Sequence, residues 1–289
     1  MRKFFSVSCA VLLYLLIHTP SLAAQAQTAE ITGIAHLSVR SSDLDREVAF
    51  LGKLGFEQAF ANVTDGKTTE AFIKVNDRQF IEVYPRTDSV QPLGLMHVCY
   101  EAAALNALNG LFLRHGLKPT ALRKAGAGNL LFSLYDPEGR ELEFTQYMPG
   151  SRHILDRGKH LGAGRVSDQI LGLDAPVRDI EGAKKFYSEL GFDEEKEGKS
   201  VRLKIPSDPD LAILLHPALA KDGPVFLLAV QDAGRTEDLL KAAGLKPERR
   251  DKVVYVRDPD GNLFELTESL KATLHRGINV IPWRRKSGD

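Results

Sequence analysis

Two copies of one β-hairpin pattern constrain this chain more than any other feature. The first copy covers residues 130–147 and has two apolar-rich strands around the turn Asp-Pro-Glu-Gly at 136–139. The second copy covers residues 253–267 around Asp-Pro-Asp-Gly at 258–261. Proline and glycine at these places are typical of a tight turn between two strands. The recurrence predicts a chain built from repeated units.

The whole pattern divides into four units of one order: a strand, a helix, and then two or three further strands (βαβββ). Glycines such as Gly55 and Gly191 follow the amphipathic stretches and mark the ends of predicted helices. The opening strands are expected at 31–40, 95–101, 169–177 and 224–230, and the helices at 43–54, 102–115, 179–190 and 236–243. The sequence therefore predicts an α+β fold of four βαβββ modules that form two tandem domains.

Length and charge limit the classes of function. A chain of 289 residues is long enough for two domains with cores of their own. The formal net charge is +0, which provides no electrostatic attraction to nucleic acid. We therefore expect a small molecule as the partner, no nucleic acid, and no membrane for the mature chain. The sequence leaves open whether the protein forms a homodimer.

The first residues have the composition of a secretory signal. Two basic residues precede an apolar run at 4–17, and small residues follow it up to Ala26. We expect residues 1–26 to be removed and the protein to be exported, either to the periplasm or out of the cell. The alternative is a retained anchor, although the run is shorter than the roughly 20 residues that span a bilayer. The mature chain then has Cys99 alone and no internal disulfide.

Segment boundaries follow from where the periodicity stops. Between the second and third units the sequence is rich in Gly, Arg and His without any pattern, which is typical of a linker. The expected segments are a signal peptide at 1–26, an N-terminal domain at 27–150, a linker at 151–168, a C-terminal domain at 169–270 and a tail at 271–289. The linker histidines His153 and His160 are interpreted as solvated.

Four residues with metal-ligand chemistry lie at equivalent places in the first two units. Glu82 follows His36 at the same spacing at which Glu143 follows His97 (82 − 36 = 46 and 143 − 97 = 46). If the two units close face to face, two imidazoles and two carboxylates meet at one centre. Such a set suits one divalent metal, namely Zn, Ni, Co, Fe or Mn. The spacing predicts a metal site in the N-terminal domain.

These motifs resemble the vicinal oxygen chelate superfamily, which includes glyoxalase I, extradiol ring-cleaving dioxygenases, epimerases, and bleomycin-resistance and fosfomycin-modifying proteins. The resemblance rests on the βαβββ units, on Gly-Ile-Ala before His36, on Met before His97, and on the Asp-Pro-Glu-Gly turn before Glu143. It covers about residues 31–269. It implies two glyoxalase-like domains with curved mixed sheets, and it is much less specific for the reaction.

The resemblance to glyoxalase-like enzymes implies roles for the four residues. Glu143 would be the catalytic base that removes a proton beside a metal-bound carbonyl, and Glu82 would be a stable ligand. The expected activity is therefore a metal-assisted proton abstraction, as in an isomerase or lyase. One alternative is extradiol ring cleavage, although Ser133 occupies the signature tyrosine position and no histidine lies between His115 and Asp136. The other alternative is a module that binds a small ligand without turnover.

The strand that carries each histidine predicts further pocket residues. Side chains two residues apart on a strand point to the same face. Ser38 and Arg40 therefore share the face of His36, while Cys99 and Glu101 share that of His97. We expect these four residues to bind substrate.

The C-terminal domain lacks most of the ligand set. Gly172 stands where His36 would be, Leu214 where Glu82 would be, and the strand at 225–228 has no histidine. Only Glu265 is kept. We expect this domain to be free of metal.

Overall fold

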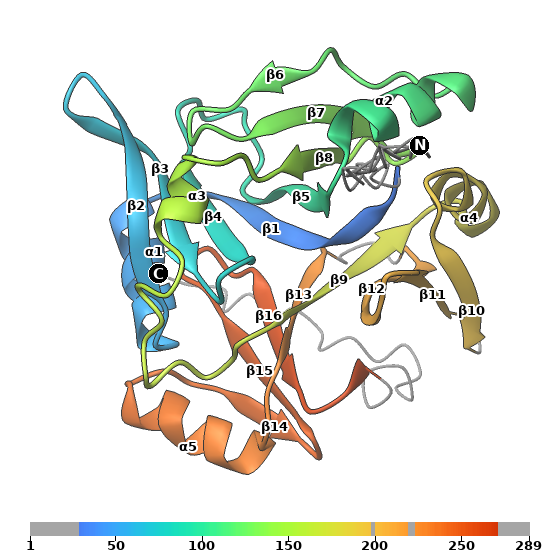
Figure 1. Cartoon of the computed structure of the whole chain (residues 1–289). Coiled ribbons are helices and arrows are strands. Elements are labelled where there is room, and N and C mark those ends of the chain that lie inside the picture. Colours follow the sequence, from blue (N-terminus) through green and yellow to red (C-terminus); the bar gives the residue numbers. More distant parts are fainter. Residues whose placement is uncertain (1–28, 198–199, 219–222, 271–289) are drawn as a thin grey trace, which may run out of the picture.

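The structure is a computed structural model that describes residues 29–197, 200–218 and 223–270. It contains two eight-stranded mixed sheets, each built from two βαβββ modules (Figure 1). The predicted fold class is confirmed. The predicted signal peptide (1–26) and tail (271–289) lie outside the described residues. Among the helices that are described, none is long and apolar enough to cross a membrane.

The N-terminal sheet has the strand order β2-β3-β4-β1-β5-β8-β7-β6. Its strands are β1 (Ile31–Ser41), β2 (Glu57–Thr64), β3 (Lys67–Lys74), β4 (Phe80–Pro85), β5 (Gly94–Ala102), β6 (Arg123–Lys124), β7 (Leu130–Tyr135) and β8 (Glu141–Gln146). The first strands of the two modules, β1 and β5, run antiparallel at the centre. Each has the last strand of its own module, β4 or β8, as its parallel outer neighbour.

The C-terminal sheet repeats this order as β10-β11-β12-β9-β13-β16-β15-β14. Its strands are β9 (Ile170–Val177), β10 (Asp193–Glu197), β11 (Ser200–Ile205), β12 (Asp208–Pro217), β13 (Val225–Ala229), β14 (Glu248–Arg250), β15 (Val253–Arg257) and β16 (Leu263–Thr267). The identical order shows that the two domains are duplicates in topology.

The helices begin and end where local chemistry requires it. They are α1 (Leu44–Lys53), α2 (Leu105–Arg114), α3 (Arg152–Leu155), α4 (Ile180–Glu189) and α5 (Ala233–Ala242). Asp43 and Asp179 cap α1 and α4, because each side chain accepts a hydrogen bond from a free backbone N–H of the first turn. Gly55 follows α1 at φ +81°, a left-handed conformation that glycine adopts without strain.

Two segments differ from the sequence prediction. The βαβββ order requires a strand between α2 and β7, where only the two-residue β6 forms, and Thr120 before it uses its backbone N–H and side chain to bond Ser133. The expected linker contains the short helix α3, and Ser151, His153 and Asp156, in or beside this helix, are buried. Figure 1 shows α3 lying beside the strands of the N-terminal domain. This segment is therefore packed on that domain instead of being solvated.

One continuous apolar core joins the two domains. The ring of Phe50 on α1 packs against Phe264 on β16, with centroids 5.6 Å apart. Tyr100 on β5 packs against Phe192 beside β10 at 5.4 Å. Contacts of this kind fix the position of one sheet relative to the other.

Candidate metal centre

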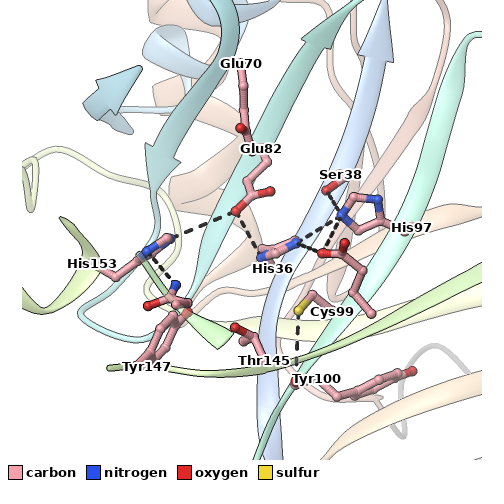
Figure 2. A network of polar contacts seen from close by, with 12 residues as sticks. His36, Ser38, Glu70, Glu82, His97, Cys99, Tyr100, Thr145, Tyr147 and His153 are labelled. Atoms are coloured by element: carbon pink, nitrogen blue, oxygen red, sulfur yellow. Dashed lines mark hydrogen bonds and ion pairs between the residues drawn. The ribbon is translucent and has the colours of Figure 1, made fainter. Parts of the chain in front are cut away.

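Two histidines and one glutamate converge on the central strands of the N-terminal sheet. His36 on β1, His97 on β5 and Glu143 on β8 place their ligand atoms within 4.8 Å of one another. The two Nε2 atoms are 3.0 Å apart, and Glu143 Oε2 lies 3.6 Å from His36 Nε2 and 3.4 Å from His97 Nε2. Figure 2 shows the two imidazole rings directed at one another from neighbouring strands. Among the residues described, this is the single group of its kind.

The triangle of donor atoms fits a divalent metal. Ligand atoms about 2.1 Å from one ion lie about 3.0 Å apart at octahedral angles and about 3.4 Å apart at tetrahedral angles. The three observed separations fall close to this range. Two ring nitrogens 3.0 Å apart can share only one proton, so a lone pair points into the triangle. The set consists of two imidazoles and one carboxylate, and both kinds of ligand suit transition metals.

Burial keeps both histidines in the neutral form that binds a metal ion. Burial lowers the pKa of His36 to about 3 and the pKa of His97 to about 4. Both rings are therefore neutral at pH 7, which is the form that binds metal. Their exposed fractions are 6% and 5%.

Glu82 is brought to the same centre but on the far side of His36. Its Oε1 lies 3.0 Å from His36 Nδ1, whereas the metal-facing atom of that ring is Nε2. A carboxylate on the second ring nitrogen fixes the orientation of a ligand histidine. The structure thus brings all four predicted metal ligands together, with His36, His97 and Glu143 around one point and Glu82 behind His36.

A buried acidic cluster extends outward from Glu82. The Tyr84 hydroxyl, which has a single hydrogen to donate, lies within hydrogen-bond distance of Glu70 Oε1 and, at 3.2 Å, of Glu82 Oε2. Asn62 donates to Glu70 Oε2 at 2.6 Å. Burial raises the pKa of Glu82 well above its ordinary value, and the neighbouring carboxylates Glu70 and Glu143 raise it further. Tyr84 and Glu70 were not singled out in the sequence, because nothing in strand periodicity distinguishes them from ordinary polar residues.

Ser38 and Arg123 contact the triad directly. Ser38 is fully buried, and its Oγ lies 2.7 Å from His97 Nε2. Arg123 Nη2 lies 3.4 Å from Glu143 Oε1, the oxygen that faces away from the histidines. This arrangement leaves Oε2 directed at the triad. Ser38 thus contacts the triad, while its predicted substrate-binding role stays a prediction, and Arg123 is an additional residue from the edge strand β6.

The other predicted pocket residues have polar partners outside the triad. Cys99 is fully buried on β5, where its Sγ contacts the Tyr100 carbonyl oxygen at 3.9 Å. Arg40 donates to the Pro92 carbonyl oxygen at 3.2 Å. Glu101 pairs with Arg78 at 2.8 Å and not with the histidines. A substrate-binding role for these residues stays a prediction.

His153 was interpreted as solvated, and this was wrong. Its side chain is only 3% exposed, and its Nε2 lies 4.0 Å from Glu82 Oε1 (Figure 2). The error has a physical reason: the patternless sequence of 151–168 does not reveal that the segment folds back on the N-terminal domain. In the C-terminal domain, His216 near the end of β12 has local partners, since its Nδ1 lies 3.0 Å from the Pro217 carbonyl oxygen and its Nε2 lies 3.4 Å from Asp174 Oδ1.

The C-terminal domain has different residues at the triad positions. Gly172 precedes the capping Asp179 by as many residues as His36 precedes Asp43. In the second sheet Leu227 pairs with Glu265, just as Cys99 pairs with Glu143 in the first sheet. Val225 is therefore the C-terminal residue at the position equivalent to His97. Gly172 also adopts φ +146°, and a Cβ there would lie 1.7 Å from the Ala212 carbonyl oxygen. Both the residue types and the backbone at this position differ from those of the first site.

Comparison with protein families agrees with this duplicated architecture. Residues 168–266 match the Glyoxalase/Bleomycin resistance protein/Dioxygenase superfamily. The C-terminal domain is therefore similar in sequence to this superfamily. The match by sequence lies in the C-terminal domain, while the N-terminal domain has the same sheet order and carries the triad. His36, His97 and Glu143 of the N-terminal domain could hold a divalent metal ion.

Solved structures share the fold at low sequence identity. A catechol 2,3-dioxygenase is 18% identical, with a TM-score of 0.62 over 82% of this chain and 88% of that chain. The 2,3-dioxygenase LapB from Pseudomonas sp. KL28 is 16% identical, with a TM-score of 0.65 over 82% and 92%. The Mn(II)-bound glyoxalase from Novosphingobium aromaticivorans is 18% identical, with a TM-score of 0.64 over 83% of each chain. A search of curated proteins found no match.

Proposed function

We propose that the N-terminal domain is a metal-dependent oxygenase site, which cleaves a ring that carries two adjacent hydroxyl groups. The observation that carries this proposal is the arrangement of His36, His97 and Glu143 around one point, with Glu82 behind His36. Two histidines and one carboxylate on one face, with the remaining positions open, are typical of non-haem Fe(II) oxygenases. The similarity to two 2,3-dioxygenases in fold supports the same reaction class.

The residues of the chain would hold and shape such a site. His36, His97 and Glu143 would bind the ion, which supplies Lewis acidity and redox chemistry when present. Glu82 holds His36 at 3.0 Å through Nδ1, whereas Ser38 Oγ lies 2.7 Å from His97 Nε2, the atom that would bind the ion, and therefore lines the site itself. Arg123 holds the outer oxygen of Glu143 and brings a positive charge to the site, where it would attract an ionised hydroxyl or a carboxylate of the substrate.

A second candidate is proton abstraction of the glyoxalase type. It is favoured by Glu82, because a second carboxylate lies at the centre and would complete the four-ligand set that the glyoxalase-like resemblance implies. In that reaction Glu143 would serve as the base. The similarity in fold to a Mn(II)-bound glyoxalase supports this second reaction, and it also supports a bound metal ion.

Assays of the protein loaded with one metal at a time distinguish ring cleavage from proton abstraction. The mature chain would be loaded without oxygen with Fe(II), Mn(II) or Zn(II), and then mixed with a panel of catechols or with a hemithioacetal. Oxygen uptake that matches the catechol consumed, with Fe(II) or Mn(II) and not with Zn(II), is the expected result. Isomerisation of the hemithioacetal without oxygen uptake would replace the proposal by the second candidate. Tight substrate binding without either reaction would identify a binding protein.

We also propose that residues 1–26 direct export, as their composition predicts. N-terminal sequencing of the protein recovered from a secreting host tests this point. A mature N-terminus near residue 27 is expected, and an intact Met1 in the membrane fraction would instead indicate a retained anchor. Size-exclusion chromatography of the same material would decide whether the protein is a homodimer.

A further inference from the structure

His153 lies in an aromatic cage at the edge of the metal centre. The ring makes edge contacts with Phe60, Phe72 and Phe80, at centroid distances of 5.1, 5.4 and 4.7 Å. Tyr147 stacks on it at 5.0 Å. The neighbouring Arg152 fastens α3 to β2, since it donates to the Ala61 carbonyl oxygen and lies over the Phe60 ring. The ring of His153 is therefore held in one orientation.

The two nitrogens of this ring have unequal surroundings. Nδ1 lies 2.9 Å from the side-chain amide nitrogen of Asn129, so Nδ1 accepts a hydrogen bond. Because Nδ1 accepts this bond it carries no hydrogen, so the ring hydrogen is on Nε2. That Nε2 is buried and has no hydrogen-bond partner. An unpaired buried donor is rare, and it lowers the stability of the folded protein by about 1–3 kcal/mol. Such a cost at this position indicates a functional role for the donor.

The unpaired donor is directed at Glu82. The distance from His153 Nε2 to Glu82 Oε1 is 4.0 Å, too long for a direct hydrogen bond but within reach of a small movement or a bridging water. The same Oε1 lies 3.0 Å from His36 Nδ1. Glu82 Oε2 lies 3.2 Å from the Tyr84 hydroxyl, a donor that it shares with Glu70. The carboxylate thus lies between one donor fixed on β4, one fixed on α3 and the ligand histidine itself.

We propose that His153 is a positioning residue of the metal centre, which holds the Glu82 carboxylate so that His36 presents Nε2 to the ion. The segment 151–168 is then part of the site and not only a connection between domains. This inference rests on the metal binding of the proposed function, but on neither of its two candidate reactions. An outer residue of this kind changes metal affinity by about 10- to 100-fold.

The test compares variants by metal affinity and by the spectrum of the bound ion. His153→Phe keeps an aromatic ring in the cage and removes the donor, whereas His153→Gln keeps a donor. Co(II) affinity would be measured by competition with a chelator, along with the Co(II) absorption spectrum and thermal unfolding without metal. We expect His153→Phe to bind Co(II) about tenfold more weakly with a shifted spectrum, and His153→Gln to recover part of the loss.

Two control variants separate positioning from packing. Phe60→Leu loosens the cage without touching a polar atom, so it should lower thermal stability and leave Co(II) affinity within twofold of wild type. His216→Gln changes a buried histidine of the C-terminal domain and should also leave affinity unchanged. Equal Co(II) affinity and spectra for wild type and a folded His153→Phe would overturn the inference alone. A wild-type protein that binds no Co(II) would overturn both the inference and the proposed function.

If His153→Phe does not fold, His153→Gln decides the question. Its altered donor position should change the Co(II) spectrum even where affinity is kept. A spectrum identical to that of wild type would contradict the positioning role.

Discussion

The carboxylate of Glu138 accepts two hydrogen bonds from Arg178, one from the backbone nitrogen at 2.9 Å and one from Nε at 2.8 Å. Glu138 lies in the turn between β7 and β8, and Arg178 lies just before α4 in the other domain. The duplicate turn makes the duplicate contact, since Asp260 accepts from the Ser42 backbone at 2.7 Å just before α1. The repeated Asp-Pro-x-Gly turns thus connect the two domains in both directions.

Removal of one turn contact should destabilise the protein. Asp260 also accepts from the hydroxyls of Ser41 and Ser42, so Asp260→Ala leaves several donors unpaired. We expect the free energy of unfolding in urea to fall by about 1–3 kcal/mol. Asp238→Ala, at an exposed position on α5, is the matched control and should change it by less than about 0.5 kcal/mol. Equal effects of the two variants would contradict the role of the turn.

Glu47 makes stability depend on pH. This residue on α1 is fully buried, and neither carboxylate oxygen has a hydrogen-bond partner. Burial, with Asp258 and Asp260 nearby, raises the pKa of Glu47 from 4.5 to about 9. Between these two values the folded protein holds a proton that the unfolded chain has released. The contribution of Glu47 to stability is therefore progressively lost as pH rises from 4.5 to 9.

Glu47→Gln should remove this pH dependence. We expect the variant to unfold like wild type at pH 5 and to be more stable by on the order of 2–3 kcal/mol at pH 7.5, measured with urea. Glu57→Gln, at an exposed position on β2, is the control and should show no such gain. A gain of the same size at pH 5 would mean that the effect is one of packing and not of ionisation.

Loss of one triad residue should abolish tight metal binding. In Glu143→Gln the amide replaces the only charged donor of the triangle, so we expect affinity for Mn(II) or Fe(II) to fall by more than about 100-fold in a chelator competition. Glu265→Gln changes the equivalent glutamate of the C-terminal domain. That variant should bind metal as wild type does, and a loss of bound metal there would indicate a second site.

A side chain introduced at position 172, the C-terminal position equivalent to His36, should destabilise the protein. A side chain at position 172 meets the Ala212 carbonyl oxygen, and the φ of +146° disfavours any residue with a Cβ. We expect Gly172→Ala to lower the free energy of unfolding by more than about 2 kcal/mol. Gly164→Ala, where a Cβ would meet nothing within 4 Å, is the control. Normal stability of Gly172→Ala would show that β9 can adopt the backbone of β1.

The positions of the ligand strands could be predicted because each module repeats. The equal spacing of His36 to Glu82 and of His97 to Glu143 follows from one topology used twice, and the observed parallel pairing of β1 with β4 and of β5 with β8 reproduces it. Period-two alternation also placed Ser38 on the face of His36 correctly. Alternation could not show which partner each of these side chains has, so Glu101, which pairs with Arg78, was grouped with Ser38, which contacts His97.

By itself, the sequence determined the four modules, the two domains and the strands that carry His36, Glu82, His97 and Glu143. These follow from local chemistry: turns, helix caps and alternation act between residues a few positions apart. Only the tertiary structure decided that Glu82 lies behind His36, that His153 is buried beside it, and that Gly172 has no room for a side chain. These relationships depend on sheet register, ring orientation and the return of segment 151–168 onto the N-terminal domain, which arise from packing between residues far apart in the chain.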